Sequence, residues 1–160
     1  MTPSAEKVAS GAEKYVVSEY RLSLNAALAL TAAARATAIA MYRNVSIAIL
    51  DQSGVEILLS RGDGVGPHNT EAARRKAYTA LSTKTETLTL ARNAKQNSDS
   101  ENLANMPELL LLGGGVPLIY NAQVVGSIGV AGGGGAENDD LIAKSAALYL
   151  LNITKSKNRK

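Results

Sequence analysis

Three glycine-rich segments combine charged side chains with bare backbone, the residue types that could hold a small polar ligand. They are Arg61–Pro67 and the segments 113–117 and 126–132. Nine of the fourteen glycines lie between Gly113 and Gly135. Glycine inside regular structure costs about 0.5–1 kcal/mol, so this density indicates left-handed backbone or close approach to another group. We therefore expect any ligand to lie near these segments.

Several charged residues accompany the glycines. Arg61 and Asp63 could pair with each other to fix the first segment, or orient a ligand. Lys76 falls on a helix face with alanines, so its stem is expected to cross an apolar surface. Its ammonium would then reach the glycine segments or pair with an acid. Arg74 and Arg75 are expected to face solvent.

His68 is the only histidine in the chain. At the start of a helix it is either a surface or capping residue, or a ligand that makes an axial bond to haem or a weak metal contact. One histidine without cysteine cannot supply the four ligands of a structural zinc site, and no metal site is expected. A Ser-His-Asp triad is not supported either, and Asp139 and Asp140 point to different faces of a helix. We expect no catalytic residues, so the protein is more readily a binding protein than an enzyme.

The four glycines Gly132–Gly135 precede a helix, where a phosphate could bind. Asp139 and Asp140 follow in the first turn of that helix and would repel an anion. The segment also lacks the endings of a P-loop or of a dinucleotide site. A flap or a subunit contact is the better interpretation.

The composition limits the class of protein. The length of 160 residues suits one domain. Four of the seventeen cations lie in residues 155–160, and the remaining thirteen face fourteen acids, so the basicity belongs to the tail. With no Phe or Trp, nucleic-acid binding is not expected. No apolar run could span a membrane, and the N-terminal residues lack a signal pattern. The sequence as given predicts a cytoplasmic protein, or a secreted or periplasmic one if a signal peptide was removed.

The hydrophobic pattern predicts alternating helices and hairpins. Ser23 is expected to cap a helix that ends near Tyr42, with Leu24, Leu28 and Ala34 on its apolar face. Strands are expected at 45–49, 55–59, 116–120 and 124–130, the first pair joined by a turn at Asp51–Gly54. Asn69 or Thr70 should cap a second helix towards Leu81, and Thr87 a third to about Ala94. Residues 97–106 are predicted as a loop, and Asn138 as the cap of the last helix.

This order predicts an α+β fold, with an antiparallel sheet and helices on both faces. The boundaries expected from the sequence are an N-terminal arm at 1–21, one domain at 22–152 and a basic disordered tail at 153–160. Within the arm, residues 15–17 suit either a strand or a helical arm. The alanine-rich helices leave small apolar surfaces that are best buried between subunits, so a homo-oligomer is expected.

Five motifs in order resemble the GlcG/HbpS-like family over about residues 22–150. They are Ile47–Gly54, Arg61–Gly64, Arg75–Ala80, Gly114–Pro117 and Gly126–Gly132 followed by Asp139, Asp140, Ile142 and Ala143. The resemblance implies a profilin-like fold, an oligomer, and a binding or accessory protein for haem or another tetrapyrrole. The alternative is an enzyme or enzyme-assisting subunit for a small polar metabolite of glycolate or diol catabolism.

The expected ligand-binding residues combine this resemblance with the glycine segments: Arg61, Gly62, Asp63, Gly64, His68, Lys76, Gly114, Gly115 and Pro117. Three departures argue against the haem and iron ligands of known members. One member of the family is a haem-binding sensor protein with an acidic Glu-x-x-Glu pair, and here Glu71 and Arg74 stand at those two positions. No histidine lies between Arg21 and Met41, where haem-binding relatives have one. Val116 replaces the threonine of that sensor's Gly-Gly-Thr-Pro turn.

Overall fold

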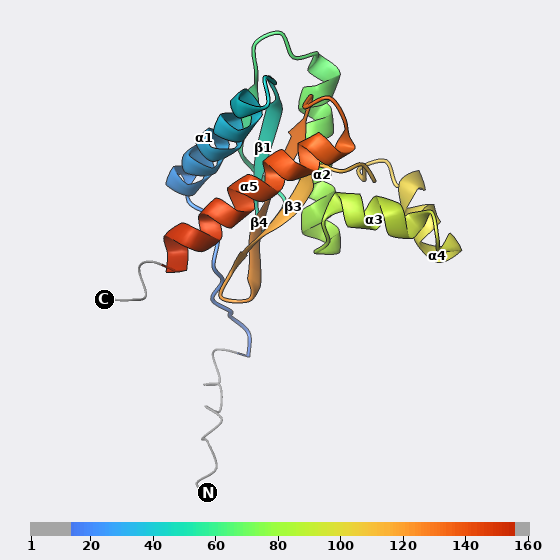
Figure 1. Ribbon diagram of the computed structural model, residues 1–160. Helices are drawn as coiled ribbons and strands as arrows, with labels where there is room; N and C mark the ends of the chain where they lie inside the picture. Colours follow the sequence, from blue (N-terminus) through green and yellow to red (C-terminus); the bar gives the residue numbers. More distant parts are fainter. Residues whose placement is uncertain (1–13, 156–160) are drawn as a thin grey trace, which may run out of the picture.

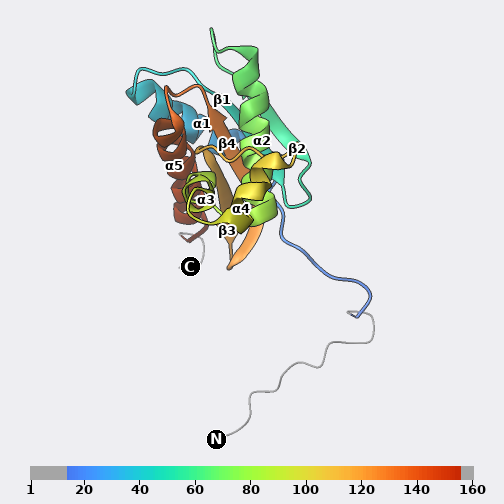
Figure 2. The ribbon, with the colours of Figure 1, turned by 90° about the vertical axis from the view of Figure 1, so that its right-hand side faces the viewer.

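The computed structural model describes residues 14–155, which form a four-stranded antiparallel sheet with helices on both faces. Figure 1 and Figure 2 show helices α1 and α5 packed together on one face and α2 on the other. The predicted α+β fold with two hairpins is therefore confirmed. None of the helices within residues 14–155 is long and apolar enough to cross a membrane.

The elements follow the predicted order. The helices are α1 (Leu24–Ala40), α2 (Pro67–Thr83), α3 (Thr87–Ala94), α4 (Ser98–Glu101) and α5 (Ala136–Lys155), with a 3₁₀ turn at Asn102–Asn105. The strands are β1 (Ser46–Asp51), β2 (Glu56–Arg61), β3 (Gly115–Tyr120) and β4 (Gln123–Ala131).

In the sheet order β2-β1-β4-β3 the two hairpins meet through β1 and β4, which pair antiparallel. Ser46 of β1 lies opposite both Arg61 of β2 and Ala131 of β4, and Gly115 of β3 lies opposite Gly129. The end of β2, the start of β1, the end of β4 and the start of β3 therefore share one end of the sheet.

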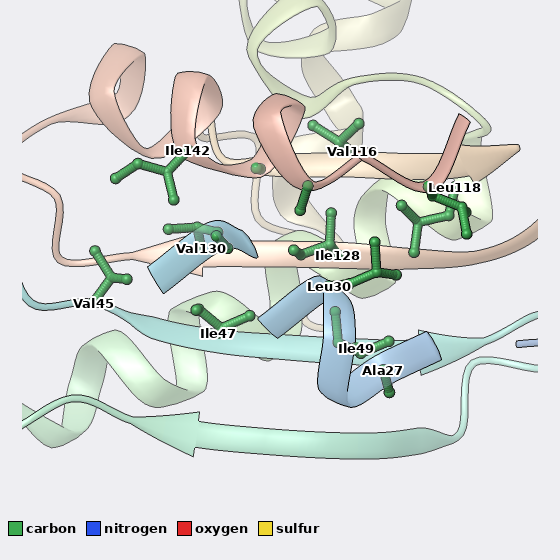
Figure 3. Close-up of a cluster of buried hydrophobic side chains, with 14 of the residues drawn as sticks. Ala27, Leu30, Val45, Ile47, Ile49, Val116, Leu118, Ile128, Val130 and Ile142 are labelled. Atoms are coloured by element: carbon green, nitrogen blue, oxygen red, sulfur yellow. The ribbon is translucent and has the colours of Figure 1, made fainter. Parts of the chain in front are cut away.

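The main core lies between the sheet and the α1–α5 layer. Figure 3 shows side chains from all these elements meeting there, among them Leu30, Ile47, Ile128 and Ile142. On the other face Ala48, Leu50 and Ala131 pack against Ala73 and Ala77 of α2. This second contact is made of small side chains, so α2 lies close to the strands.

The first helix differs in part from its prediction. Ser23 is the N-cap as predicted, and its Oγ accepts from the Ala26 N–H. Ala34 is buried, but Leu24 and Leu28 are more than half exposed and Leu30, which the prediction omitted, is buried. The buried stripe is therefore rotated away from the two leucines, and these leave an apolar surface on the outside of α1.

Three helix starts are also corrected. Helix α2 begins at Pro67 after Gly66 because proline suits the first position of a helix, so Asn69 and Thr70 lie inside it. Helix α5 begins at Ala136, before Asn138, whose side chain donates to the Gly133 carbonyl. Glu86 is the N-cap of α3, with Thr87 its first residue.

The segment predicted as a loop at 97–106 instead contains α4 and the 3₁₀ turn. Asn97 begins it, because its side chain accepts from the Asp99 N–H. At the chain ends, residues 15–22 form neither strand nor helix, and α5 includes residues 153–155 of the expected tail. Residues 1–13 and 156–160 lie outside the described residues.

Candidate functional site

The three glycine segments meet at one end of the sheet. Gly62–Gly66 follows β2, and Gly113 and Gly114 precede β3. The third segment, 126–132, runs along β4 and reaches this end only at Gly132, which Gly133–Gly135 follow. Since these three strand ends share one edge, the convergence expected from the sequence is present in the fold. We call this edge the glycine end.

A buried ion pair lies behind the glycine end. The Lys76 side chain is 1% exposed, and its Nζ lies 2.8 Å from Asp139 Oδ2. The same Nζ donates to the Val130 carbonyl at 3.0 Å. Asp139 Oδ1 accepts from the Gly133 N–H at 2.7 Å. Lys76 thus both reaches a glycine segment and pairs with an acid, and its charge is neutralised inside the protein.

Gly114 and Gly115 allow close packing around this pair. A Cβ at Gly114 would lie 2.8 Å from Asp139 Cβ and 3.2 Å from Lys76 Nζ, at a φ of +121°. A Cβ at Gly115 would collide with the Lys76 carbonyl. Pro117 continues into β3 opposite Ser127. These residues therefore form the supporting layer beneath the surface.

The Arg61–Pro67 segment is fixed by its backbone. The Gly62 N–H donates to the Val45 carbonyl at 3.1 Å, and Asn44 Nδ2 donates to the Asp63 carbonyl at 3.1 Å. Arg61 and Asp63 are exposed, and no ion pair joins them within residues 14–155. Arg61 lies across β1 from β4, about 10 Å away at ~4.8 Å per strand. Lys76 is buried, so the two cations do not share an open surface.

An open cleft of about 330 Å³ lies at the glycine end. We call it the glycine-end cleft; it is lined by Tyr42, Arg43, Asn44, Asp63, Gly64, Val65, Gly66, Asn69 and Gly132. A second hollow beside it is lined by Ile39, Tyr42, Arg43 and Asn44, and a third by Arg35 and Gly62 among others. Arg43 and Asn44 belong to all three, so the hollows form one continuous surface.

Sequence reasoning missed several residues of this surface, among them Tyr42 and Arg43. Tyr42 is 97% exposed and has a φ of +57°, an unusual conformation for a bulky residue. The Arg43 guanidinium lies against the β4–α5 loop, since a Cβ at Gly134 would be 2.9 Å from its Cζ. The available signal was an aromatic and a cation directly between an alanine-rich helix and a buried strand.

His68 lies at the rim of the glycine-end cleft. It is exposed, and a Cβ at Gly66 would be 3.0 Å from its Nδ1, so the ring lies over a residue that lines the cleft. Among residues 14–155, no cluster of three His, Asp or Glu side chains could hold a metal ion.

The two arginines before Lys76 differ in role. Arg74 is part exposed and pairs with Glu71 at 2.7 Å, a hydrogen bond that holds the pKa of the Glu71 carboxyl below its usual value. Arg75, which we expected to be solvated, donates to the carbonyls of Pro107 and Leu109. It therefore ties α2 to the segment that leads into β3.

Comparison with known proteins defines the class. Residues 22–148 match the sequence profile of the family described as haem degrading protein HbpS-like, and the chain belongs to this family. It is 35% identical over 110 residues to protein GlcG of Escherichia coli K12, which covers 69% of this chain and 81% of GlcG. It is 32% identical over 127 residues to an uncharacterised 15.0 kDa protein from the dhaT-dhaS intergenic region of Citrobacter freundii, covering 78% and 89%.

Solved structures agree in fold. A double mutant of Streptomyces reticuli HbpS superposes with a TM-score of 0.80 at 34% identity, over 92% of this chain and 99% of that one. A complex of PduOC with haem superposes with a TM-score of 0.72 at 28% identity, over 80% and 94%. The GlcG/HbpS-like resemblance of the motifs is therefore confirmed.

Proposed function

We propose that this chain is a non-enzymatic, oligomeric binding protein for haem or another tetrapyrrole. The observation that carries the proposal is the joint exposure of Ile39, Tyr42 and Arg43 beside the glycine-end cleft. An apolar and aromatic surface next to a guanidinium suits a flat macrocycle with carboxylate substituents. Membership of the family, and the haem complex of the relative PduOC, support this ligand class.

The residues present fit such a ligand in three ways. Arg43, with Arg35 in the adjoining hollow, supplies cations for propionates. Ile39 and Tyr42 supply contact area for the ring. The Tyr42 phenol and the His68 imidazole are side chains able to bind haem iron. Tyr42 would be the residue that holds the iron, because it lines both the glycine-end cleft and the adjoining hollow formed with Ile39. Bound haem would supply an iron centre able to accept and donate electrons.

The remaining predicted site residues divide into a wall and a support. Gly62, Asp63 and Gly64 form the wall of the hollows, with Arg61 at the end of β2 beside them. Lys76, Gly114, Gly115 and Pro117 hold the β3 and β4 ends in place from behind. In this assignment Lys76 acts on the ligand only through the position of the backbone.

The size of the glycine-end cleft bears on the oligomer. About 330 Å³ is at the low end of the ~300–1,000 Å³ typical of ligand sites, so a macrocycle would extend onto the exposed Ile39–Tyr42 surface. A neighbouring subunit would cover the outer side of the ring. The exposed Leu24 and Leu28 on α1, and Leu141 and Leu148 on α5, offer apolar surface for that contact.

A second candidate is a small polar carboxylate, as for a subunit serving glycolate or diol catabolism. The same polar cleft favours it, because Arg43, Asn44, Asn69 and the loop backbone suit a hydroxy acid without any macrocycle. Thermal-shift measurements with short hydroxy acids and diols test this candidate. A shift from these compounds, with no haemin binding, would replace the tetrapyrrole proposal.

Titration of the purified protein with haemin tests the main proposal. Saturable binding with a shifted Soret band and a defined stoichiometry is expected. A spectrum identical to that of free haemin at all ratios would overturn the proposal.

A further inference from the structure

A separate cleft of about 360 Å³ lies at the opposite end of the sheet from the glycine end. The β1–β2 turn, the start of β4, the end of α2 and the segment before α1 surround it. We call it the turn-end cleft, and its lining residues are Glu19, Tyr20, Gln52, Ser53, Gly54, Tyr78, Leu81, Ser82, Lys84, Gln123 and Val124. Nothing in the proposed function uses this cleft.

One part of the turn-end cleft is rich in hydrogen-bond acceptors. Glu19 accepts from Gln52 Nε2 at 3.4 Å, which orients the amide. The amide oxygen, Gln52 Oε1, is buried and has no hydrogen-bond partner within residues 14–155. A buried acceptor without a partner is unfavourable, so a ligand that brings a donor to it is favoured. A carboxylate beside this oxygen suits an ammonium group.

A free cation belongs to the same cleft. Lys84 ends α2 in the left-handed conformation, with a φ of +51°, and its side chain is exposed. No ion pair involves Lys84 in the described part of the chain. Glu19 and Lys84 are the charged residues of the lining, one of each sign, and the hydroxyls of Ser53 and Ser82 lie among them.

Two tyrosines form walls of the turn-end cleft. The Tyr78 ring lies on the β1–β2 turn, since a Cβ at Gly54 would be 3.3 Å from its Cε2. The Tyr20 ring meets Tyr120 edge to face with centroids 5.0 Å apart. Tyr20 is half exposed, whereas the Tyr78 ring is held against the turn before any ligand arrives, which lowers the entropy cost of binding.

We propose that the turn-end cleft binds a small zwitterion, an amino acid, independently of the glycine end. The ligand ammonium lies towards Glu19 and Gln52 Oε1, and its carboxylate towards Lys84 and the serine hydroxyls. The paired charges of the lining match the two charges of an amino acid, and a volume of about 360 Å³ is enough for a ligand of that size. The site would let the protein respond to a metabolite that differs from its tetrapyrrole.

Thermal-shift and calorimetric measurements with single L-amino acids at millimolar concentration test the proposal. At least one is expected to raise the melting temperature by several degrees near saturation. Glu19→Gln and Lys84→Gln should each weaken that affinity about tenfold or more, because each removes a charge-assisted hydrogen bond. Glu101→Gln and Lys95→Gln, at exposed positions outside the cleft, are the matched controls and should bind like the parent.

The chemistry of the ligand provides the decisive comparison. The decarboxylated amine and the N-acetylated form of the same amino acid should both lose binding. Equal binding of either form, or no response to any amino acid, would overturn the proposal. Haemin titration of Glu19→Gln and Lys84→Gln should match the parent protein, which keeps this test separate from that of the glycine end.

Discussion

Lys76 Nζ and Asp139 Oδ2 lie 2.8 Å apart, joining α2 on one face of the sheet to α5 on the other. Both residues are buried, at 1% and 5% exposure. The pair also holds the β4 end, through Val130, and the following loop, through Gly133. It therefore fixes the backbone on both sides of Gly132, a lining residue of the glycine-end cleft.

Removing one member of this pair should be strongly destabilising. Lys76→Met or Asp139→Asn leaves a buried group without its partner, and we expect a loss of about 3–5 kcal/mol in the free energy of unfolding. The double variant should be less destabilised than the sum of the two, since neither charge remains. Urea denaturation measures all three.

The exposed pair of Arg92 and Glu137 supplies the control. Arg92→Gln should change the free energy of unfolding by less than about 1 kcal/mol. Equal effects of Arg92→Gln and Lys76→Met would contradict the role given to the buried pair.

Gly129 is expected to be needed for the approach of α2 to the sheet. A Cβ there would collide with the Ala73 carbonyl, so Gly129→Ala should destabilise by at least the ~1–3 kcal/mol of overpacking. Gly64 has free space around it but a φ of +74°, and Gly64→Ala should cost only the ~1–2 kcal/mol of a left-handed residue. Chemical denaturation gives both values; a smaller effect at Gly129 than at Gly64 would show that α2 can move away.

The stabilising effect of Glu71 should depend on pH in one direction. Arg74 lowers the pKa of Glu71 from 4.5, mainly through their hydrogen bond. A carboxyl whose pKa is lower in the folded state stabilises above its unfolded pKa and loses that effect as the pH falls through the folded value. The stability difference between the parent and Glu71→Gln should therefore shrink below about pH 4.5. A difference that grows on acidification would contradict the assigned direction.

Self-association should depend on the outer faces of α1 and α5. Leu28 and Leu148 are 51% and 58% exposed, and burying them against a second subunit would remove apolar surface from water. We expect light scattering to give a multiple of 16.6 kDa. Leu28→Lys and Leu148→Lys should lower that mass, whereas Val55→Lys, at an exposed turn, should not. A parent protein of 16.6 kDa at micromolar concentration would contradict the oligomer.

The fold could be predicted because turns have local sequence signals, and helices and strands have regular hydrophobic periods. Asp51–Gly54 gives a turn with Gly54 at a φ of +80°. In the strand before it, the large residues Ile47 and Ile49 alternate with the small residues Ser46 and Ala48. The buried face of α1 was harder, because alanines occupy nearly every direction around it and only packing decides that Leu30 rather than Leu28 enters the core.

The order of the elements along the chain predicts where the site lies, but not which residues pair within it. The glycine segments converge as expected because both hairpins join one sheet. The partner of Lys76 is 63 residues away, so spacing alone could not select Asp139. Tyr42 was missed because its exposure results from a left-handed backbone at the helix end, which has no glycine to mark it.

Haemin titration of three single variants tests the central claim most directly. Tyr42→Phe should remove the side chain that would hold the iron and so change the spectrum of the bound haem. Arg43→Ala should weaken affinity about tenfold or more, because the ion pair with a propionate is lost. His68→Ala should bind like the parent. Loss of the spectrum with His68→Ala but not with Tyr42→Phe, or unchanged binding by all three variants, would contradict the proposed site.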